Sequence, residues 1–202
     1  MRIAYADPPY IGQSAKHFRH HPDYAGEVDH EALIARLVEE YPDGWALSAS
    51  SPSLRIILPM CPEDVRVAAW VKPFCAFKPN VNPAFAWEPV IWRGGRRRTR
   101  EEPTIRDWLA ANITLQRGLV GVKPEPFCFW LFGVLGLGPE DELHDLFPGT
   151  GAIARAWDQY KAQTRCELRL EAQTPSLLTL PEAPAVAPDG HYPEQLALEA
   201  LP

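Results

Sequence analysis

The chain alternates short apolar runs with stretches of helical spacing, and this alternation limits its fold more than any other feature of the sequence. Short apolar runs bounded by turn residues are typical of buried strands, whereas apolar residues three and four positions apart indicate amphipathic helices. Strands that alternate with helices usually build a largely parallel sheet with helices packed against its faces. We therefore predict an α/β fold with a mostly parallel sheet.

The predicted elements follow one another along most of the chain. Strands are predicted at 3–6, 45–49, 65–71, 86–92, 142–147 and 166–170. Helices are predicted at 29–40, 51–58, 105–113, 127–137 and 152–161. Asp29 is a typical N-cap for the first helix, and Pro89 inside the fourth strand favours an edge or a bulge. The long loop 11–28 is of the kind that often forms a lid or a binding loop.

The composition is that of one globular domain followed by an acidic tail. The 202 residues are 46% hydrophobic and 23% charged, which is enough apolar material for a core of ordinary size. Residues 172–202 are rich in Pro, Ala and Glu and contain no Lys or Arg, so we predict a domain at 1–171 and a disordered tail after it. The net charge of -6 argues against attraction of nucleic acid by the whole surface.

The cysteines and the start of the chain indicate the compartment. Cys61, Cys75, Cys128 and Cys166 are scattered without a CxxC spacing, so we expect reduced thiols and no metal site. The first predicted strand begins within two residues of the start, which leaves no room for a signal peptide. No apolar run approaches the roughly 18 residues of a membrane span. We therefore expect a cytoplasmic protein that does not enter a membrane.

Asp7-Pro8-Pro9-Tyr10 directly follows the first predicted strand. Ligands of open α/β sheets bind at the carboxyl ends of the strands, so a ligand is expected at this tetrapeptide. The carboxylate accepts hydrogen bonds from an amino group, the prolines fix the backbone and remove its donors, and the tyrosine ring offers a stacking face. Together these groups can hold an amino-bearing heterocycle for chemistry at its nitrogen.

A second motif, Asp145 to Gly151, joins a predicted strand to a helix through a glycine turn. Gly149 and Gly151 allow the backbone to approach a ligand closely, and the start of the helix presents free amide groups. The G-x-G-x-x-G dinucleotide fingerprint is not present, because no glycine follows Gly151 at the required place. The turn therefore predicts a ligand site that need not hold a phosphate.

These two motifs, with Lys123-Pro124 before an apolar helix, resemble the amino-group DNA methyltransferases that use S-adenosylmethionine (SAM). The catalytic tetrapeptide comes first and the glycine turn last, an order similar to the circularly permuted, β-type enzymes that methylate adenine N6 or cytosine N4. Trp70-Val-Lys-Pro and Trp87-Glu-Pro-Val-Ile also resemble segments of small phage-borne members. The resemblance implies a Rossmann-like, circularly permuted sheet with an antiparallel edge, in a bacterial or phage-infected cell.

The resemblance also implies a role for each motif. Around a base flipped out of the duplex it puts Asp7, Pro8, Pro9 and Tyr10. At the cofactor it puts Lys123, Pro124, Asp145, Phe147, Gly149, Thr150 and Gly151. An aspartate at the first position of the tetrapeptide favours adenine N6. The family usually ends the next strand with an acidic residue for the ribose, and Glu167 is the candidate because Asp158 lies in a predicted helix.

Arginines gather between the two motifs, in a predicted flexible basic arm. They are Arg93, Arg96, Arg97, Arg98 and Arg100. The permuted arrangement has its target recognition in this part of the chain, so 93–118 is a candidate recognition insert, and the arginines either contact phosphates of double-stranded DNA or form a solvated loop. Two alternatives to a DNA methyltransferase stay open: a methyltransferase-like protein that binds nucleic acid without turnover, and an RNA adenine-N6 methyltransferase.

Overall fold

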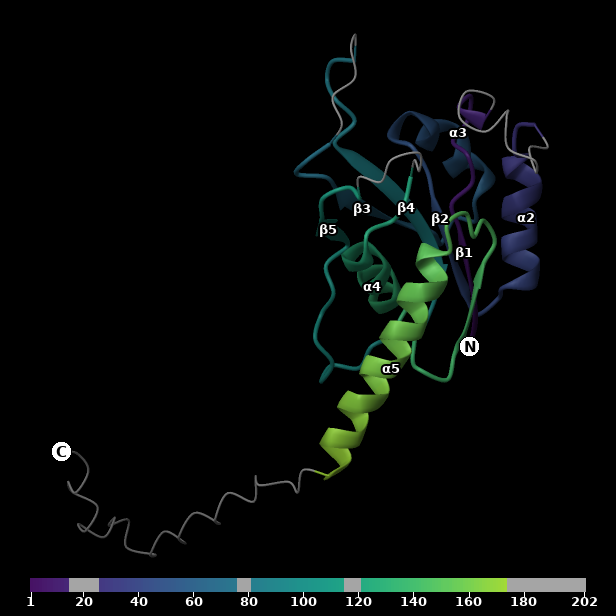
Figure 1. Ribbon diagram of the computed structural model, residues 1–202. Helices are drawn as coiled ribbons and strands as arrows, with labels where there is room; N and C mark the ends of the chain where they lie inside the picture. The colour runs from purple at the N-terminus through teal and green to yellow at the C-terminus, as the bar shows by residue number, and fades with distance from the viewer. Residues whose placement is uncertain (15–25, 76–80, 115–120, 174–202) are drawn as a thin grey trace, which may run out of the picture. The chain divides into compact units, whose positions relative to one another are not determined.

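The computed structural model describes residues 1–14, 26–75, 81–114 and 121–173 (Figure 1). The chain divides into two compact units, Met1–Arg165 and Cys166–Pro202. Of the second unit, only the end of a helix, as far as Gln173, is described. The predicted tail after this residue and most of the predicted loop 11–28 lie outside the described residues.

Six strands in the described ranges form one sheet. They are β1 (Arg2–Ala6), β2 (Gly44–Ser48), β3 (Arg66–Val71), β4 (Trp87–Gly94), β5 (Trp108–Ala110) and β6 (Glu142–Asp145). Their order across the sheet is β5-β3-β4-β2-β1-β6. β1 is parallel to β2 and β6, β3 is parallel to β5, and β4 is antiparallel to both β3 and β2. The α/β class with a mostly parallel sheet is confirmed, but the antiparallel strand lies inside the sheet and not at its edge.

Pro89 does not force β4 to an edge, because a proline lacks only its N–H and keeps its carbonyl. Within β4 it pairs with Ala69 of β3, and its carbonyl accepts a hydrogen bond from the amide of Ala49 at 3.0 Å. The backbone on both sides of β4 therefore stays paired.

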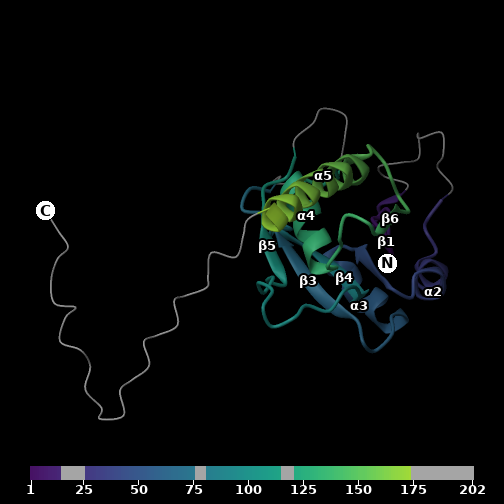
Figure 2. The same ribbon diagram turned by 90° about the horizontal axis from the view of Figure 1, so that it is seen from below.

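Helices cover both faces of the sheet. They are α2 (His30–Glu40), α3 (Leu54–Ile57) between 3-10 turns at Ser51–Ser53 and Leu58–Met60, α4 (Glu125–Val134) and α5 (Ala152–Gln173). Figure 2 shows α4 and α5 on one side of the sheet and α2 and α3 on the other. Each side has its own apolar core, one around Tyr5 and Phe127 and one around Leu37 and Trp45. None of the helices in the described ranges has both the length and the apolar character needed to cross a membrane.

The first predicted helix is confirmed together with its cap. The Asp29 side chain accepts a hydrogen bond from the amide of Ala32 at 3.0 Å, as an N-cap residue should. The buried residues of α2 include Leu33, Ile34 and Leu37, which are the positions that the spacing predicts.

Two predicted elements are wrong. The sequence predicts a helix at 105–113, but Trp108–Ala110 forms β5, because pairing with β3 satisfies this backbone in an extended form. The sequence predicts a strand at 166–170, but these residues belong to α5. No glycine or proline interrupts Ala152–Gln173, and its Ala, Gln, Glu and Arg residues are strong helix formers.

The strand directions bring separate parts of the chain to one edge of the sheet, called the carboxyl edge from here. β1 and β6 are parallel, so Asp7 follows β1 at the same edge at which β6 ends with Asp145. β4 runs the other way, so Glu88 near its start reaches this edge beside Lys72, which follows β3. Ligands of open α/β sheets bind at this kind of edge.

Candidate active site

Asp7 is ion-paired at the carboxyl edge. Lys123, shortly before α4, holds its Nζ 2.9 Å from Asp7 Oδ1. The Asp7 side chain is 21% exposed and that of Lys123 only 5%, so the carboxylate reaches solvent while its partner does not. Burial raises the pKa of Asp7 above its usual value, and Lys123 opposes this rise. Asp7 is thus a partly exposed carboxylate that is paired with a buried cation.

Glu88 on β4 connects three further side chains. Its Oε2 accepts a hydrogen bond from Lys123 Nζ at 3.1 Å, its Oε1 is paired with Lys72, and the Tyr10 hydroxyl donates to the same carboxylate. Burial would raise the pKa of Glu88, but Lys123 and Lys72 outweigh burial and lower it to about 2. Asp7, Tyr10, Lys72, Glu88 and Lys123 therefore form one connected cluster, called the edge network from here.

Lys123 is the centre of the edge network. The resemblance assigns it to the cofactor, yet its ammonium group contacts Asp7 and Glu88 and lies 5.9 Å from the Tyr10 ring centroid. Although burial would lower the pKa of Lys123, the anionic Asp7 is the largest of the groups that raise it well above its usual value. At neutral pH the ammonium is therefore charged.

Sequence reasoning missed Lys72 and Glu88 as site residues. The signal lay in the phase of the strands, because side chains two positions apart face the same side of a sheet. Glu88 is in phase with Val90, and Lys72 is in phase with Trp70, and both of these apolar residues are buried. A charged side chain on the same face of the sheet as these buried residues needs a partner of opposite charge or a hydrogen bond. For Glu88 that partner is Lys123, which lies shortly before α4.

Two tyrosines flank Asp7. Tyr5 is buried in β1, and its hydroxyl shares a hydrogen bond of 2.8 Å with Ser48 Oγ. Tyr10 is partly buried, and its hydroxyl lies 3.5 Å from Lys123 Nζ. Burial raises the pKa of both tyrosines well above the usual value, so both hydroxyls are neutral at neutral pH. Between them, Pro8 is buried and Pro9 half-buried, which fixes the backbone after Asp7.

The glycine turn, Asp145–Gly151, follows β6. Asp145 Oδ1 accepts a hydrogen bond from the amide of Phe147 at 3.1 Å, whereas Oδ2 is buried without a partner among the described residues. Burial, with a smaller effect from Asp7, raises the pKa of Asp145 to about 6. Gly149 and Gly151 have φ angles of 46° and 72°, in the left-handed region that favours glycine. A buried acceptor beside such a turn suits a ligand that donates a hydrogen bond or carries positive charge.

The remaining predicted cofactor residues surround this turn or begin α4. Pro124 is the N-cap residue of α4, Phe147 packs against the core on the α2 side, and the Thr150 carbonyl accepts a hydrogen bond from Arg155 at 2.8 Å. Glu167 is not at the end of a strand, because it lies in α5. Among the described residues no strand follows α5, so none of them supplies the acidic residue that the resemblance leads one to expect there.

The five arginines of the arm lie at the opposite edge of the sheet from Asp7. Arg96 pairs with Asp141 at 2.8 Å, and Asp141 also binds the amino group of Met1, which precedes β1. β1 has five residues and therefore spans about 16 Å, so the edge network and this site are far apart. The structure brings Asp7 and Asp145 to one edge but does not bring the arginines to it.

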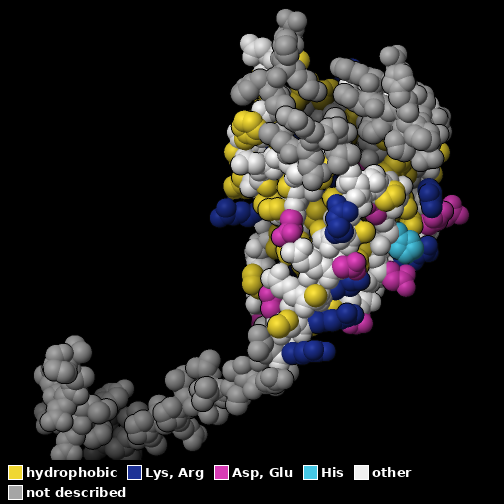
Figure 3. Space-filling model, viewed as in Figure 1, with side chains coloured by type: hydrophobic (Ala, Val, Ile, Leu, Met, Phe, Trp, Pro, Cys, Tyr) yellow, Lys and Arg dark blue, Asp and Glu magenta, His cyan; other side chains and the backbone are white. Residues whose placement is uncertain are grey.

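The arm is also less free than predicted. Arg93 pairs with Asp64 at 2.7 Å, and Arg98 donates to the carbonyl of Gly133 at 3.0 Å. Arg97 and Arg100 are exposed and make no ion pair with other described residues. Figure 3 shows Lys and Arg side chains on one face of the molecule in separate groups among acidic ones, without a broad basic patch.

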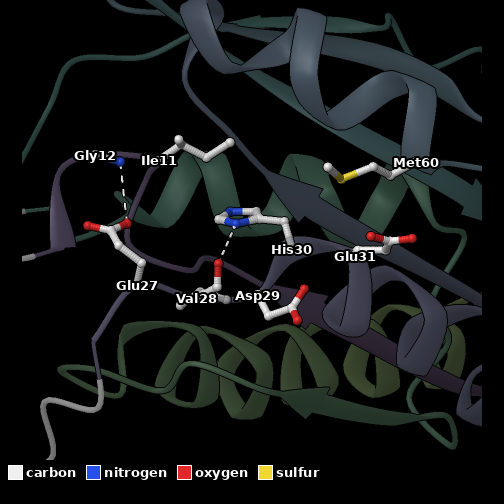
Figure 4. Close-up of a pocket in the computed structure, with 8 residues that line it drawn as sticks. All are labelled: Ile11, Gly12, Glu27, Val28, Asp29, His30, Glu31 and Met60. Carbon is white, nitrogen blue, oxygen red and sulfur yellow. Dashed lines mark hydrogen bonds between the residues drawn. The ribbon is translucent and has the colours of Figure 1, made fainter.

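A hollow of about 410 Å³ lies against the two residues that follow Tyr10 and the start of α2 (Figure 4). It is lined by Ile11, Gly12, Glu27, Val28, Asp29, His30, Glu31 and Met60. Two polar groups of the hollow are already hydrogen-bonded within the protein. His30 Nδ1 pairs with the Val28 carbonyl at 2.9 Å, and the Gly12 amide donates to Glu27 at 3.3 Å. Its three carboxylates disfavour a phosphate. Within the described ranges, no cluster of His, Cys, Asp and Glu is suited to a metal ion.

Solved structures of one protein, M1.HpyAVI, match this chain. The crystal structure of the M1.HpyAVI–SAM complex matches with a TM-score of 0.53 and 16% identity, over 79% of this chain and 78% of that chain. The crystal structure of M1.HpyAVI matches with a TM-score of 0.50 and 18% identity, over 79% and 76%. No protein-family model and no curated protein sequence matches. At these identities the chain is similar to M1.HpyAVI in fold, over most of the length of both.

Proposed function

We propose that the protein is a SAM-dependent DNA methyltransferase that methylates an exocyclic amino group of a flipped base, adenine N6. The observation that carries the proposal is Asp7, a partly exposed carboxylate held by Lys123 at the carboxyl edge, next to the glycine turn on the neighbouring strand. The shared fold with M1.HpyAVI, which has been crystallised as a complex with SAM, supports it. The order of the motifs supports the permuted arrangement, and the aspartate at position 7 supports adenine over cytosine.

The glycine turn fits SAM. The methionine part of SAM carries an ammonium group, and such a group would provide the partner that the buried Asp145 Oδ2 lacks among the described residues. Gly149 leaves room, since a Cβ placed on it would meet no atom closer than 3.8 Å. Asp145, Phe147 and the backbone from Gly149 to Gly151 would hold the cofactor there. This unpartnered acceptor favours an enzyme over a protein that binds nucleic acid without turnover.

In this proposal Asp7 orients the amino group. The lone pair of adenine N6 is delocalised into the ring, so the nitrogen is a poor nucleophile until its hydrogens are held. Asp7 accepts one N6–H and the Pro8 carbonyl accepts the other, while the Tyr10 ring stacks on the base. SAM, when bound, supplies the methyl group: the nitrogen bonds to the methyl carbon as the carbon–sulfur bond breaks, and the electron pair of that bond stays on sulfur. Asp7 receives the proton that the nitrogen then loses and passes it to solvent.

Exposed aromatic rings at the carboxyl edge provide a surface for the nucleic acid. Phe74 follows β3 and is 51% exposed, and Phe85 precedes β4 and is 52% exposed. Unstacked bases next to a flipped base can stack on such rings, and this offsets part of the cost of flipping. The arginine arm, by contrast, contributes at most phosphate contacts away from this edge.

The test is methyl transfer from tritiated SAM to duplex DNA, with the modified base identified by mass spectrometry. We expect N6-methyladenine in the wild-type reaction, and a loss of at least about 10³-fold in Asp7→Ala with SAM affinity in calorimetry unchanged within about twofold. Glu40→Gln, in an exposed ion pair on α2, is the matched control and retains activity. Full activity of Asp7→Ala contradicts the role of Asp7, and methyl transfer only to a matched RNA contradicts the DNA assignment.

A further inference from the structure

We propose that Glu88 and Lys72 are positioning residues that act on Asp7 through Lys123. Glu88 shares Lys123 with Asp7, so that Lys123 holds one oxygen of Asp7 and leaves the other oxygen for the amino group of the base. The inference rests on the proposed function, because it concerns the same carboxylate.

The contacts are divided between the two carboxylates in a way that supports this role. Lys123 Nζ lies 2.9 Å from Asp7 Oδ1 and 3.1 Å from Glu88 Oε2, so the ammonium group divides its donors between them. No described residue donates a hydrogen bond to Asp7 Oδ2. If Glu88 did not compete for Lys123, the ammonium group would be held by Asp7 alone and would compete with the base for both of its oxygens.

Charge balance explains the presence of Lys72. Asp7 and Glu88 are anions, Lys123 and Lys72 are cations, and Lys72 is paired with Glu88. The four charges cancel within the edge network. The Lys72 and Glu88 side chains are only 11% and 16% exposed, so solvent and salt screen their interactions weakly. Removal of either charge should therefore change the electrostatic energy of Asp7 with little screening.

The charged groups nearest Asp7 act on its pKa in opposite directions. The negative charge of Glu88 raises the pKa of Asp7, while Lys123 and Lys72 lower it. The other titratable neighbours are Tyr5 and Tyr10, which are neutral, and Asp145 at the end of β6. Removal of Glu88 charge should thus lower the pKa of Asp7, and removal of Lys72 charge should raise it. A residue that serves only packing would cause neither change.

The experiment compares Glu88→Gln, Lys72→Met and the double variant with wild type, and uses Glu40→Gln as the control. We expect kcat to fall by about 10- to 100-fold in Glu88→Gln, with KM for SAM unchanged within about twofold. The acid limb of the kcat/KM profile should move to lower pH in Glu88→Gln and to higher pH in Lys72→Met, by about 0.5 to 1 pH unit each. The double variant should return the limb close to its wild-type pH, and the control should not move it.

A second readout does not need activity. The carboxyl carbon of Asp7, followed by NMR in the protein without ligands, should titrate with the same two opposite shifts. The positioning role is overturned if the pH of the acid limb and the pKa of Asp7 stay the same in both single variants. It is also overturned if they move in the same direction in both. If wild type transfers no methyl group to DNA, the proposed function fails, and the titration of Asp7 still decides whether Glu88 and Lys72 act on it. Should Glu88→Gln fail to fold, Lys72→Met decides by its own direction.

Discussion

The edge network and the glycine turn lie on neighbouring strands, yet they treat their charges in opposite ways. In the edge network each carboxylate is paired with the buried Lys123, and Glu88 is also paired with the half-buried Lys72. In the glycine turn Asp145 has no cation, and one of its oxygens has no hydrogen-bond partner among the described residues. The charges of the first region are balanced before a ligand arrives, whereas the second has a buried acceptor without a cation or a donor among the described residues. Under the proposed function, the base would be oriented by groups whose charges are already paired, and the cofactor would supply the partner that Asp145 lacks.

The largest effect is expected when the shared cation at the centre of the edge network is removed. Lys123→Met would leave Asp7 and Glu88 as neighbouring anions without their shared cation. We expect the free energy of unfolding to fall by about 3 to 5 kcal/mol in urea denaturation. Arg36→Met, which removes the exposed pair with Glu40, is the control and should change it by about 0.5 kcal/mol or less. An equal small change in both variants would show that the edge network is not electrostatically coupled.

The next largest effect tests whether a ligand supplies the partner that Asp145 lacks in the glycine turn. Asp145→Asn should weaken SAM binding by about 10- to 100-fold in calorimetry, because a charge-assisted hydrogen bond to the ligand is lost. Binding of SAM to wild type should strengthen as pH rises through about 6, where Asp145 ionises, and this dependence should vanish in the variant. Equal affinities in the two proteins would remove Asp145 from the cofactor site.

Although Asp145→Asn should weaken SAM binding, it should raise the free energy of unfolding of the protein without ligands. The folded-state pKa of Asp145 is raised, so its contribution to stability is fully present below the unfolded value near 4 and is lost as pH rises through about 6. Asp145→Asn carries no such charge. At pH 8 it should therefore be more stable than wild type by about 1 to 2 kcal/mol, after allowance for the partial exposure of Asp145, and the gain should shrink toward pH 4. A gain that does not depend on pH would contradict the burial of an unpaired carboxylate.

A smaller effect separates nucleic-acid binding from cofactor binding. Phe74→Ala with Phe85→Ala should weaken binding of a DNA duplex carrying a mismatched target adenine by about tenfold, since each stacked base contributes about 1 to 3 kcal/mol and some stacking is recovered elsewhere. SAM affinity should not change, because both rings lie at the carboxyl edge outside the glycine turn. Fluorescence anisotropy measures the binding of the duplex, and calorimetry measures the affinity for SAM. A loss of SAM affinity as well would mean that the two regions are not independent.

The smallest effect is expected from the arginine arm. Arg97→Glu with Arg100→Glu reverses the two arginines without described ion pairs, and should reduce the salt dependence of DNA binding by a slope of about 2 or less. Arg36→Glu with Arg55→Glu, at exposed positions of α2 and α3, is the control that matches the change in net charge. An unchanged slope would exclude the arm from the DNA interface, which its position at the opposite sheet edge already disfavours.

Particular residues show how far the sequence carries a prediction. β1 and the tetrapeptide after it are predicted because apolar spacing and prolines act locally, and α2 is predicted because Asp29 caps it. Trp108–Ala110 is not predicted, because pairing with β3 overrides its local preference. Residues 166–170 are misassigned because an alternating pattern of Cys, Glu, Leu and Arg fits a helix surface as well as a strand.

The sequence by itself determines which chemistry is available at two strand ends: a carboxylate, prolines and a tyrosine after the first strand, and an aspartate with two glycines after the last. The tertiary structure alone decides which charges meet. It brings Lys72, Glu88 and Lys123 from three separate segments to Asp7, and it holds the arginines about one strand length away. The reason is physical: local spacing specifies strands and helices, whereas buried ion pairs form between residues far apart in the chain once strand order and direction are fixed.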